Sequence, residues 1–344
     1  MLALCKVEAV EGGVALRDMA EPEAGPGEIR IKVAAAGICG TDMQIWKWAP
    51  RMARRMKLPR VLGHELSGVV DQVGAGVTEV ALGDHVSLES HMYCGVCTQC
   101  RSSRAHLCTA TTYPGIDFDG GFAQYAVAPA RIAWKNPKDM PHEIAAMQEP
   151  FGIAVHASLI GRGVSGLSVL VNGCGPIGLM NVAAARALGA RLVVASDPNP
   201  LRRAMALKLG ADLALDPATD DVPARARDAT GGDGVEVGIE YSGTEAGFRA
   251  VFDSLTKGAD FRLVGAPPTA IPVDFTYWLL KCPTLHNIHG RRIWDDWVSA
   301  TELLHSGRID LRPIASHVLP LADARRGCEL VLAGEALKPI LLPN

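Results

Sequence analysis

Four cysteines close together in the chain are its most distinctive chemical feature. Cys94, Cys97, Cys100 and Cys108 lie in one short segment, and the first three have the spacing Cys-x-x-Cys-x-x-Cys. Four thiolates complete a tetrahedral zinc site, which leaves no coordination position for a substrate. Unliganded buried thiols and an iron–sulfur cluster are the alternatives, but this clustering among only nine cysteines favours zinc. We therefore predict a structural zinc ion that stabilises a loop.

A glycine-rich segment in the second half of the chain has the spacing of a dinucleotide-binding turn. Gly173, Gly175 and Gly178 follow an apolar run, and Asp197 ends the next apolar run along the chain. Such glycines let a pyrophosphate approach the backbone at a helix N-terminus, and an acid in this later position accepts hydrogen bonds from the ribose. A plain glycine turn is the alternative. Asp197 would repel a 2'-phosphate, so NAD is favoured over NADP, although Arg202 could neutralise a phosphate, stack on adenine or pair with Asp197.

The elements around these motifs predict an α/β chain with two kinds of architecture. Up to about residue 127, short alternating strands such as 29–34 and 68–73 are separated by turns, which indicates a mostly β region. From about residue 151, apolar strands alternate with alanine-rich helices, the pattern of a parallel sheet with crossover helices. The expected strands are 168–172, 192–196, 235–240 and 260–265, and the expected helices are 179–188, 201–209 and 247–255. The last fifty residues should contain one amphipathic helix, about 295–305, and a strand near 339–342.

Length and composition exclude several classes of protein. The 344 residues suggest about two domains, and 48% apolar with 21% charged residues is ordinary for a globular protein in water. The net charge of -3 provides no overall positive field for nucleic acid. The uncharged stretch 163–185 contains five glycines, so we interpret it as strand, turn and helix rather than a membrane span. No secretion signal is visible near residue 1, so we expect a cytoplasmic protein without membrane or nucleic-acid partners.

Three dispersed sites complete the set of chemically significant residues. Cys39, the pair His64 and Glu65, and Glu149 would each pass for a core or surface residue alone. Together with the two motifs above, they resemble the medium-chain zinc-dependent alcohol dehydrogenase family, over essentially the whole chain. Within it, the L-threonine 3-dehydrogenase branch is the most similar, on the strength of the segments Ile38-Cys-Gly-Thr-Asp42, Glu149-Pro-Phe-Gly-Ile-Ala-Val-His156 and Gly290-Arg-Arg292 with Trp297.

The resemblance implies a GroES-like, β-rich catalytic domain over 1–154, a doubly wound Rossmann domain over 155–290 and a return segment over 291–344. It implies a catalytic zinc in the cleft between the two domains, and therefore two zinc ions per chain, in a homo-oligomer that would be a tetramer. Cys39, His64 and Glu65 match the family's zinc-ligand positions, and Glu149 matches a further ligand or an exchangeable carboxylate. Thr41 matches the hydroxyl that passes on the substrate proton. The positions that match NAD contacts are Ile177, Asp197, Arg202, Val264, Gly265, Ala266, Ile288 and His289.

Two features depart from that family pattern. Gln44 occupies the position where threonine dehydrogenases have a histidine, and glutamine cannot take up or release a proton near neutral pH. The segment from Arg51 to Arg60 carries five cationic side chains. A solvated loop is the simplest interpretation, and an anionic substrate or an oligomer contact are the alternatives.

The sequence thus predicts an enzyme that transfers hydride from a secondary alcohol to NAD with the help of zinc. The expected small-molecule substrate is L-threonine or a related β-hydroxy amino acid. A polyol or sugar-alcohol dehydrogenase is the alternative, since Gly-His-Glu combined with Glu149 also suits that branch. A zinc-free reductase or an inactive homologue is a further alternative.

Overall fold

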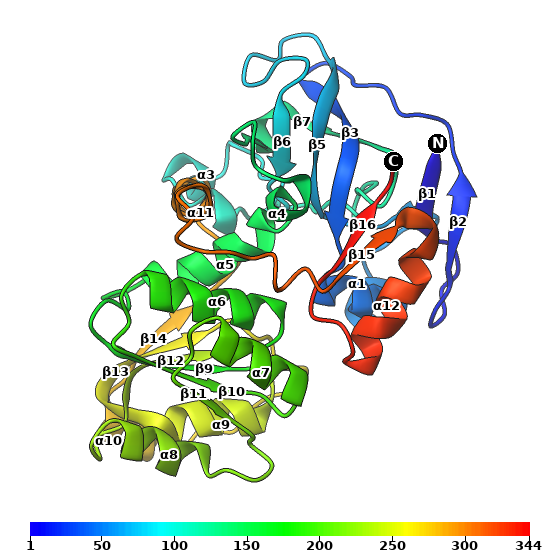
Figure 1. Ribbon diagram of the computed structural model, residues 1–344. Coiled ribbons are helices and arrows are strands. Elements are labelled where there is room, and N and C mark those ends of the chain that lie inside the picture. The colour runs from blue at the N-terminus through cyan, green and yellow to red at the C-terminus, as the bar shows by residue number, and fades with distance from the viewer. The chain divides into compact units, whose positions relative to one another are not determined.

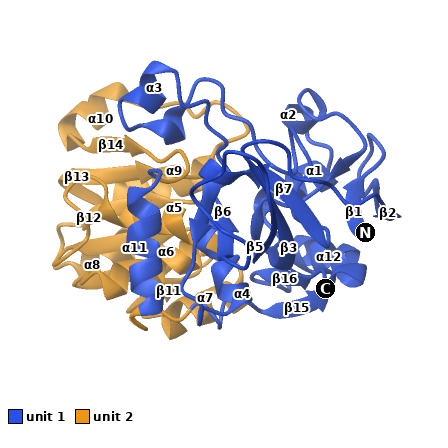
Figure 2. Cartoon of the chain, turned by 90° about the horizontal axis from the view of Figure 1, so that it is seen from above, with its two compact units in different colours: residues 1–150, 292–305, 311–344 blue, residues 151–291, 306–310 orange.

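The computed structural model describes residues 1–344, which divide into two compact units (Figure 2). Unit 1 contains residues 1–150, 292–305 and 311–344, and unit 2 contains residues 151–291 and 306–310. The chain therefore leaves unit 1, forms most of unit 2, and then returns to complete unit 1.

Unit 1 is built on a mainly antiparallel sheet of seven strands. The order is β15-β16-β3-β5-β6-β8, and β7 pairs with β3. Its C-terminal strand β16 pairs with β3, so the last residues complete the sheet that the first hundred begin (Figure 1). A smaller sheet has the order β2-β1-β4. The strands are β1 (Leu2–Lys6), β2 (Val14–Asp18), β3 (Glu28–Gly37), β4 (Arg60–Val61), β5 (Glu65–Val73), β6 (His85–Leu88), β7 (Tyr125–Pro129), β8 (Ala133–Lys135), β15 (His317–Pro320) and β16 (Pro339–Leu342).

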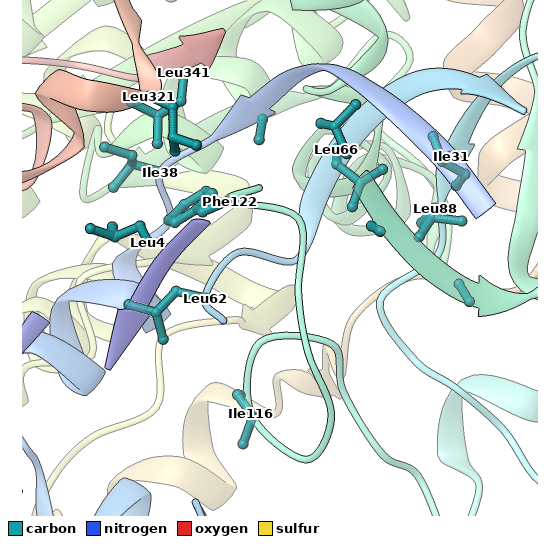
Figure 3. Close-up of a cluster of buried hydrophobic side chains, with 14 of the residues drawn as sticks. Leu4, Ile31, Ile38, Leu62, Leu66, Leu88, Ile116, Phe122, Leu321 and Leu341 are labelled. Carbon is teal, nitrogen blue, oxygen red and sulfur yellow. The ribbon is translucent and has the colours of Figure 1, made fainter. Parts of the chain in front are cut away.

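The core of unit 1 follows from the alternation of apolar and polar residues along β3. Ile29, Ile31 and Val33 are fully buried, whereas Lys32 between them is exposed, as expected for one buried sheet face. These side chains belong to a cluster in which the ring of Phe122 lies near Leu4 (Figure 3). The C-terminal end of β3 is buried on both faces and leads directly to Cys39.

Helices of unit 1 are mostly short: α1 (Gly40–Trp46), α2 (Pro50–Ala53), α3 (Thr98–Arg101), α4 (His142–Ala145), α11 (Asp295–His305) and α12 (Ala324–Ala333). The prediction of a single helix in the last fifty residues was wrong, because this segment also forms α12. The buried face of α12 includes Ala324, Gly327, Cys328 and Leu330, and a glycine inside a helix weakens the prediction of that helix. The longer helix α5 (Gln148–Leu159) begins in unit 1 and continues into unit 2.

Unit 2 is a six-stranded sheet in the order β11-β10-β9-β12-β13-β14, and every neighbouring pair is parallel. The strands are β9 (Ser168–Asn172), β10 (Leu192–Ser196), β11 (Leu213–Leu215), β12 (Val235–Glu240), β13 (Leu255–Leu263) and β14 (Thr284–Asn287). The helices are α6 (Pro176–Ala187), α7 (Pro200–Lys208), α8 (Val222–Ala229), α9 (Glu245–Ser254) and α10 (Phe275–Lys281). The strand order reverses between β9 and β12, which is the doubly wound arrangement, and ligands of such sheets bind beside the carboxyl ends of strands at that point. The predicted α/β fold class is confirmed.

None of the helices has the length and apolar character needed to cross a bilayer. The uncharged stretch 163–185 contains β9, the glycine turn and most of α6, as the sequence predicted.

Candidate active site

The four clustered cysteines bring their sulfur atoms together in unit 1. All four Sγ atoms lie within 4.8 Å of one another, and none is in a disulfide. The Sγ of Cys97 is 3.5 Å from that of Cys100 and 4.0 Å from that of Cys108. Backbone N–H groups donate to the sulfurs, and those of Cys100 and Thr109 lower the pKa of Cys97 to about 5. Four converging thiols, one of them readily ionised, fit the donor set of a tetrahedral zinc ion.

A second group of possible metal ligands forms where two neighbouring strands meet. One ligand atom from each of Cys39, His64 and Glu65 lies within 4.8 Å of the others. Cys39 follows β3 and Glu65 begins β5, and the two strands pair with Gly37 opposite Glu65. Strand pairing thus brings residues that are well separated in the sequence to one site.

Gly63 allows the chain to enter this site. Its φ of +90° is in the region that favours glycine, and a Cβ atom there would lie 2.3 Å from the ring of Phe122. Only glycine fits both this backbone conformation and this space, and the conformation determines how the chain continues into His64.

Negative charge surrounds this second group. Burial would lower the pKa of His64, but Cys39, Asp42 and Glu149 outweigh it and raise the pKa to about 10. Burial also raises the pKa of Glu65, and Glu149 adds to this effect. The buried Oε1 of Glu65 has no hydrogen-bond partner. A thiol, an imidazole and an unpartnered carboxylate oxygen, buried in such a field, fit a divalent zinc ion.

Lys338 is a part of this site that sequence reasoning missed. It is almost completely buried, forms an ion pair with Glu65, and its Nζ donates to the carbonyl of Ile38 at 3.0 Å. Burial lowers its pKa, but Glu65, Cys39 and Glu149 together outweigh burial and raise it overall. The only sequence signal is one cation just before the apolar run of β16, and it does not identify a partner in the first quarter of the chain.

Asp42 is the second residue that was missed. Its Oδ2 accepts a hydrogen bond from the backbone N–H of Cys39 at 2.8 Å, and its Oδ1 lies 4.0 Å from Nδ1 of His64. Asp42 therefore contacts the backbone of one possible ligand and lies beside the ring of another, which positions both.

The remaining residues that the resemblance predicts for the catalytic site are also in unit 1. Glu149, in the first turn of α5, accepts a hydrogen bond from the Oγ of Ser90 and is not one of the three converging ligands. Thr41 and Gln44 are three positions apart on α1, so their side chains lie on one face of that helix. Thr41 is partly exposed and Gln44 is exposed.

The basic segment from Arg51 to Arg60 is partly neutralised within unit 1. Arg55 forms two hydrogen bonds with Asp117, at 2.7 and 2.6 Å, and Arg60 forms one with Asp119 at 3.1 Å. The three other cations are exposed: Arg51, Arg54 and Lys57.

In unit 2 the glycine turn connects β9 to α6 at the point where the strand order reverses. Gly173 has a φ of +88°, and a Cβ on Gly178 would lie 2.0 Å from the Gly173 carbonyl oxygen. A Cβ on Gly175 would meet nothing within 4 Å, which leaves space beside the backbone for a ligand. Pro176 begins α6, so the N-terminus of that helix faces this space.

Asp197, which follows β10, is buried and has several partners. Its Oδ2 accepts from the N–H of Cys174 and its Oδ1 from the N–H of Asn199, both at 2.8 Å. Arg202 lies 3.6 Å from its Oδ2, so the structure favours the pairing alternative for Arg202. Asp197 therefore joins the glycine turn to the N-terminus of α7, where Asn199 is the N-cap.

The other predicted cofactor residues follow strand ends. Ile177 is in the first turn of α6. Val264, Gly265 and Ala266 come directly after β13, and Ile288 and His289 come directly after the neighbouring strand β14. These positions are all in unit 2.

Comparison with known proteins identifies the family. Residues 25–138 match the alcohol dehydrogenase GroES-like domain, and residues 176–306 match the zinc-binding dehydrogenase domain. The L-threonine 3-dehydrogenase of Thermococcus kodakarensis is 41% identical over 334 residues, which cover 96% of this chain and 95% of that protein. The chain belongs to the zinc-dependent alcohol dehydrogenase family. The family predicted from the sequence is therefore confirmed, as is the predicted similarity to its threonine dehydrogenase branch.

A further relative and two solved structures support the same family for this dehydrogenase. The L-threonine 3-dehydrogenase of Bacillus velezensis is 40% identical, and the match covers 96% of each chain. Among solved structures, galactitol-1-phosphate dehydrogenase from Escherichia coli has a TM-score of 0.92, 26% identity and full coverage of both chains. The 2R,3R-butanediol dehydrogenase of Bacillus subtilis has a TM-score of 0.90, 27% identity and coverage of 100% and 99%. Members of this family use zinc and a nicotinamide dinucleotide.

We predict that Cys97→Ser reduces the stability of this dehydrogenase more than its chemistry, because a closed thiolate site contributes to folding free energy. Its unfolding temperature should fall by roughly 5 °C or more, the shift expected for a loss of about 2 kcal/mol. Calorimetry and metal analysis provide the measurement, with Cys282→Ser, at an exposed cysteine outside the cluster, as control. A normally stable Cys97→Ser protein with a selective loss of turnover would contradict the structural assignment.

Proposed function

We propose that this dehydrogenase binds two zinc ions and uses NAD to oxidise the secondary hydroxyl of L-threonine or a related β-hydroxy amino acid. The observation that carries the proposal is the convergence of Cys39, His64 and Glu65 in a chain that is 41% and 40% identical to two threonine dehydrogenases. We assign residues 1–154 to the catalytic domain, 155–290 to the NAD-binding domain and 291–344 to the return segment.

The charges of the site support a role in activating an alcohol. A bound zinc ion supplies Lewis acidity, which lowers the pKa of a ligated hydroxyl. Cys39, His64 and Glu65 are the residues that would hold it, and two of them are anionic donors that weaken this acidity. Lys338 offsets one of those negative charges through its ion pair with Glu65. The site thus keeps strong ligands without the full loss of electrophilicity that two unpaired anions would cause.

We assign the transfer of the alcohol proton to Thr41 and a supporting role to Gln44. The Thr41 hydroxyl, shortly after Cys39 in the chain, would relay the alcohol proton, donating its own proton to solvent as it accepts one. Gln44, exposed one turn further along α1, can orient a water molecule but cannot accept the proton itself. NAD accepts the hydride, and the residues after β13 and β14 would bind its nicotinamide.

A polyol substrate is the second candidate. The structural similarity to galactitol-1-phosphate and butanediol dehydrogenases favours it, but at 26% and 27% identity rather than the 41% of the threonine dehydrogenase. The exposed cations Arg51, Arg54 and Lys57 would suit a substrate with an anionic group, which both threonine and a sugar phosphate carry.

We predict that the purified protein reduces NAD with L-threonine faster than with sorbitol or butanediols, and that Cys39→Ser and His64→Ala each abolish turnover. Both residues lie in unit 1, apart from the cofactor turn in unit 2, so NAD affinity and folding should persist. NADH absorbance, NAD titration and circular dichroism provide the readouts. Full activity in either variant would overturn the catalytic-metal assignment, and a wild-type preference for polyols would overturn the substrate.

Cofactor preference should depend on Asp197, which would contact the ribose and repel a 2'-phosphate. We expect Asp197→Ala to reduce the preference for NAD over NADP by about tenfold or more, the value of a hydrogen bond to a charged group. Asp197→Asn also removes the charge but keeps one of the two oxygens that accept from Cys174 and Asn199, so it tests the repulsion with less damage to the turn than Asp197→Ala. If both variants keep the wild-type ratio of kcat/KM values, Asp197 only stabilises the turn.

We predict that Gln44→His introduces a titrating group one turn after Thr41, near the proposed path of the alcohol proton. A histidine there could contribute general-base help of up to about 100- to 10,000-fold and add a limb to the pH profile near its ordinary pKa of about 6.5. We expect kcat for threonine to rise near neutral pH, measured as initial rates across the acidic and alkaline sides of neutrality, whereas Gln44→Asn should not change the shape of the profile. An unchanged profile with threonine as a poor substrate would favour a polyol that hydrogen-bonds Gln44.

We further propose that the dehydrogenase is a homo-oligomer. Its resemblance to the family implies a tetramer. Support comes from β14, an edge strand of the unit 2 sheet, and from α10, which exposes Phe275, Leu279 and Leu280. Sedimentation should give a multiple of 36.4 kDa. Leu280→Glu should shift the protein towards the monomer, whereas Leu82→Glu, at a similarly exposed leucine in unit 1, should not. A wild-type monomer would contradict the proposal.

A further inference from the structure

Arg51, at the start of helix α2, is a positive charge that the fold of unit 1 leaves uncompensated. Of the cations between Arg51 and Arg60, Arg55 and Arg60 form ion pairs with aspartates. Arg51 is exposed and forms no ion pair. An exposed arginine is ordinary on a protein surface, so the groups around it decide whether it can recognise a ligand.

The face of α2 that carries Arg51 is turned towards Tyr113. The backbone N–H groups of Arg55 and Met56 both donate to the carbonyl of Met52, so the helical turn continues past the end of α2. Arg51 and Arg55 are four positions apart, which places them on one face of this turn. The guanidinium carbon of Arg55 lies 4.8 Å from the centre of the Tyr113 ring. Burial raises the pKa of Tyr113, and the charges of Arg55 and Arg51 oppose that rise.

Arg55 is not available to a ligand, because the fold occupies its guanidinium. It forms two hydrogen bonds with Asp117, at 2.7 and 2.6 Å, and one with the carbonyl of Thr111 at 3.1 Å. Asp117 also accepts from the backbone N–H of Tyr113 at 2.7 Å. Arg55 and Asp117 therefore compensate each other's charge and hold Tyr113 in place. Arg51 remains as the uncompensated cation on this face.

Tyr113 connects this face of α2 to the residues that follow β6. Met92 and Thr112 exchange backbone hydrogen bonds, at 2.9 and 3.2 Å, which aligns the two segments. The centres of the Tyr113 and His91 rings are 5.1 Å apart, in an edge-on arrangement. These contacts lead from α2 to the end of β6.

The end of β6 in turn contacts the candidate active site. Ser90 donates a hydrogen bond to Oε1 of Glu149, and both side chains are buried. Glu89 accepts from the ring Nδ1 of His91 at 2.9 Å and from the indole N–H of Trp297 at 2.6 Å, which holds this short segment in place. Packed and hydrogen-bonded groups therefore join the surroundings of the uncompensated cation to a carboxylate of the candidate active site.

Negative charge inside the site gives a cation in this position a use. Several anionic groups surround His64 and, against the effect of burial, raise its pKa to about 10. Such a site attracts a metal cation but repels the anionic group of a substrate. A guanidinium binds a carboxylate or a phosphate through paired N–H groups. Arg51 would therefore hold an anionic group away from the negative charge while the hydroxyl of the same molecule reaches the metal.

We propose that Arg51, with the hydroxyl of Tyr113, binds the anionic group of the substrate alcohol. This inference rests on the proposed function, in which that group is the carboxylate of threonine or of a related β-hydroxy amino acid. A sugar-alcohol phosphate carries a group of the same chemistry, and neutral polyols carry none. The subsite therefore selects charged alcohols over neutral ones.

The test compares charged and neutral alcohols as substrates of the zinc-loaded, full-length protein. Arg51→Gln removes the charge but keeps a long polar side chain. We expect it to raise KM for L-threonine by about three- to tenfold, less than for a buried pair because solvent screens Arg51. KM for 2,3-butanediol should not change. The value of kcat should change for neither substrate, because the lost interaction is the same in the ground state and in the transition state.

Two further measurements report the charge of the subsite. The ratio kcat/KM for L-threonine should fall as ionic strength rises, and this dependence should be weaker in Arg51→Gln because salt screens exposed charges. Calorimetry with L-2-aminobutyrate, which is threonine without its hydroxyl, measures binding without turnover. Arg51→Gln should weaken that binding by the same factor as it raises KM for threonine.

Three variants separate recognition of the anion from other effects. Arg51→Lys keeps the charge and should largely restore the wild-type KM. Arg17→Gln removes an exposed cation from β2 and should leave KM for threonine unchanged. Tyr113→Phe keeps the ring that contacts Arg55 and His91 and loses only the hydroxyl. It should raise KM for threonine by about twofold or more, the value of a single hydrogen bond, and leave butanediol unaffected.

The outcomes separate this inference from the proposed function. If threonine is the better substrate and Arg51→Gln changes KM for threonine and 2,3-butanediol equally, or changes neither, the subsite is refuted and the proposed function stands. If the wild-type protein oxidises a sugar-alcohol phosphate but not threonine, and Arg51→Gln raises KM for that phosphate but not for butanediol, the proposed substrate fails and the subsite stands with phosphate as its anion. If the wild-type protein oxidises only neutral polyols, both fail.

Discussion

The ion pair between Lys338 and Glu65 is the contact on which the rest of the site depends. Burying two charges costs several kcal/mol each, and their attraction compensates only when the geometry is good, so removing one partner is strongly destabilising. Here the cation comes from the segment before β16 and the anion from the start of β5. Because β16 and β5 flank β3 in the sheet, this pair forms only when the C-terminal segment has returned to unit 1. The counter-charge of Cys39, His64 and Glu65 is therefore supplied by a segment that follows unit 2 in the sequence.

Whether a feature could be predicted from the sequence depended on how far apart in the chain its interacting residues are. The four-cysteine group and the glycine turn have local spacings dictated by ligand geometry and by helix N-termini, so the sequence revealed both. The strands and helices of unit 2 also follow local periodicity, and their predicted ranges agree closely with β9, β10 and α6. Helix α12 was not predicted because Gly327 lies inside it, and an internal glycine weakens the helical signal. Cys39 and His64, by contrast, were recognised as a group only through the family resemblance.

The supporting contacts had no sequence signal because they connect distant positions. Lys338, near the end of the chain, pairs with a residue in its first quarter, and Trp297 contacts Glu89 although 208 positions separate them. A lone lysine or tryptophan carries no information about such a partner until the sheet and α11 are in place. Asp42 is close to Cys39 in the sequence, but its side chain accepts from the backbone N–H of Cys39 only because the short helix α1 begins there. Sequence spacing thus predicts which residues can bind a metal or cofactor, whereas tertiary structure determines the charge and orientation they have there.

The two functional sites use carboxylates in opposite ways, and the difference lies in their partners. Asp197 accepts two backbone N–H bonds and has Arg202 nearby, so its negative charge is stabilised before any cofactor arrives. These contacts hold the carboxylate in one orientation beside the glycine turn, which suits selection against a 2'-phosphate. Glu65, in contrast, is buried with a single cation and an oxygen without a hydrogen bond, and burial raises its pKa. A bound metal ion would give Glu65 the favourable electrostatic interaction that backbone N–H groups give Asp197. The same functional group would therefore serve as a fixed charge at the proposed cofactor turn and as a ligand at the proposed metal site.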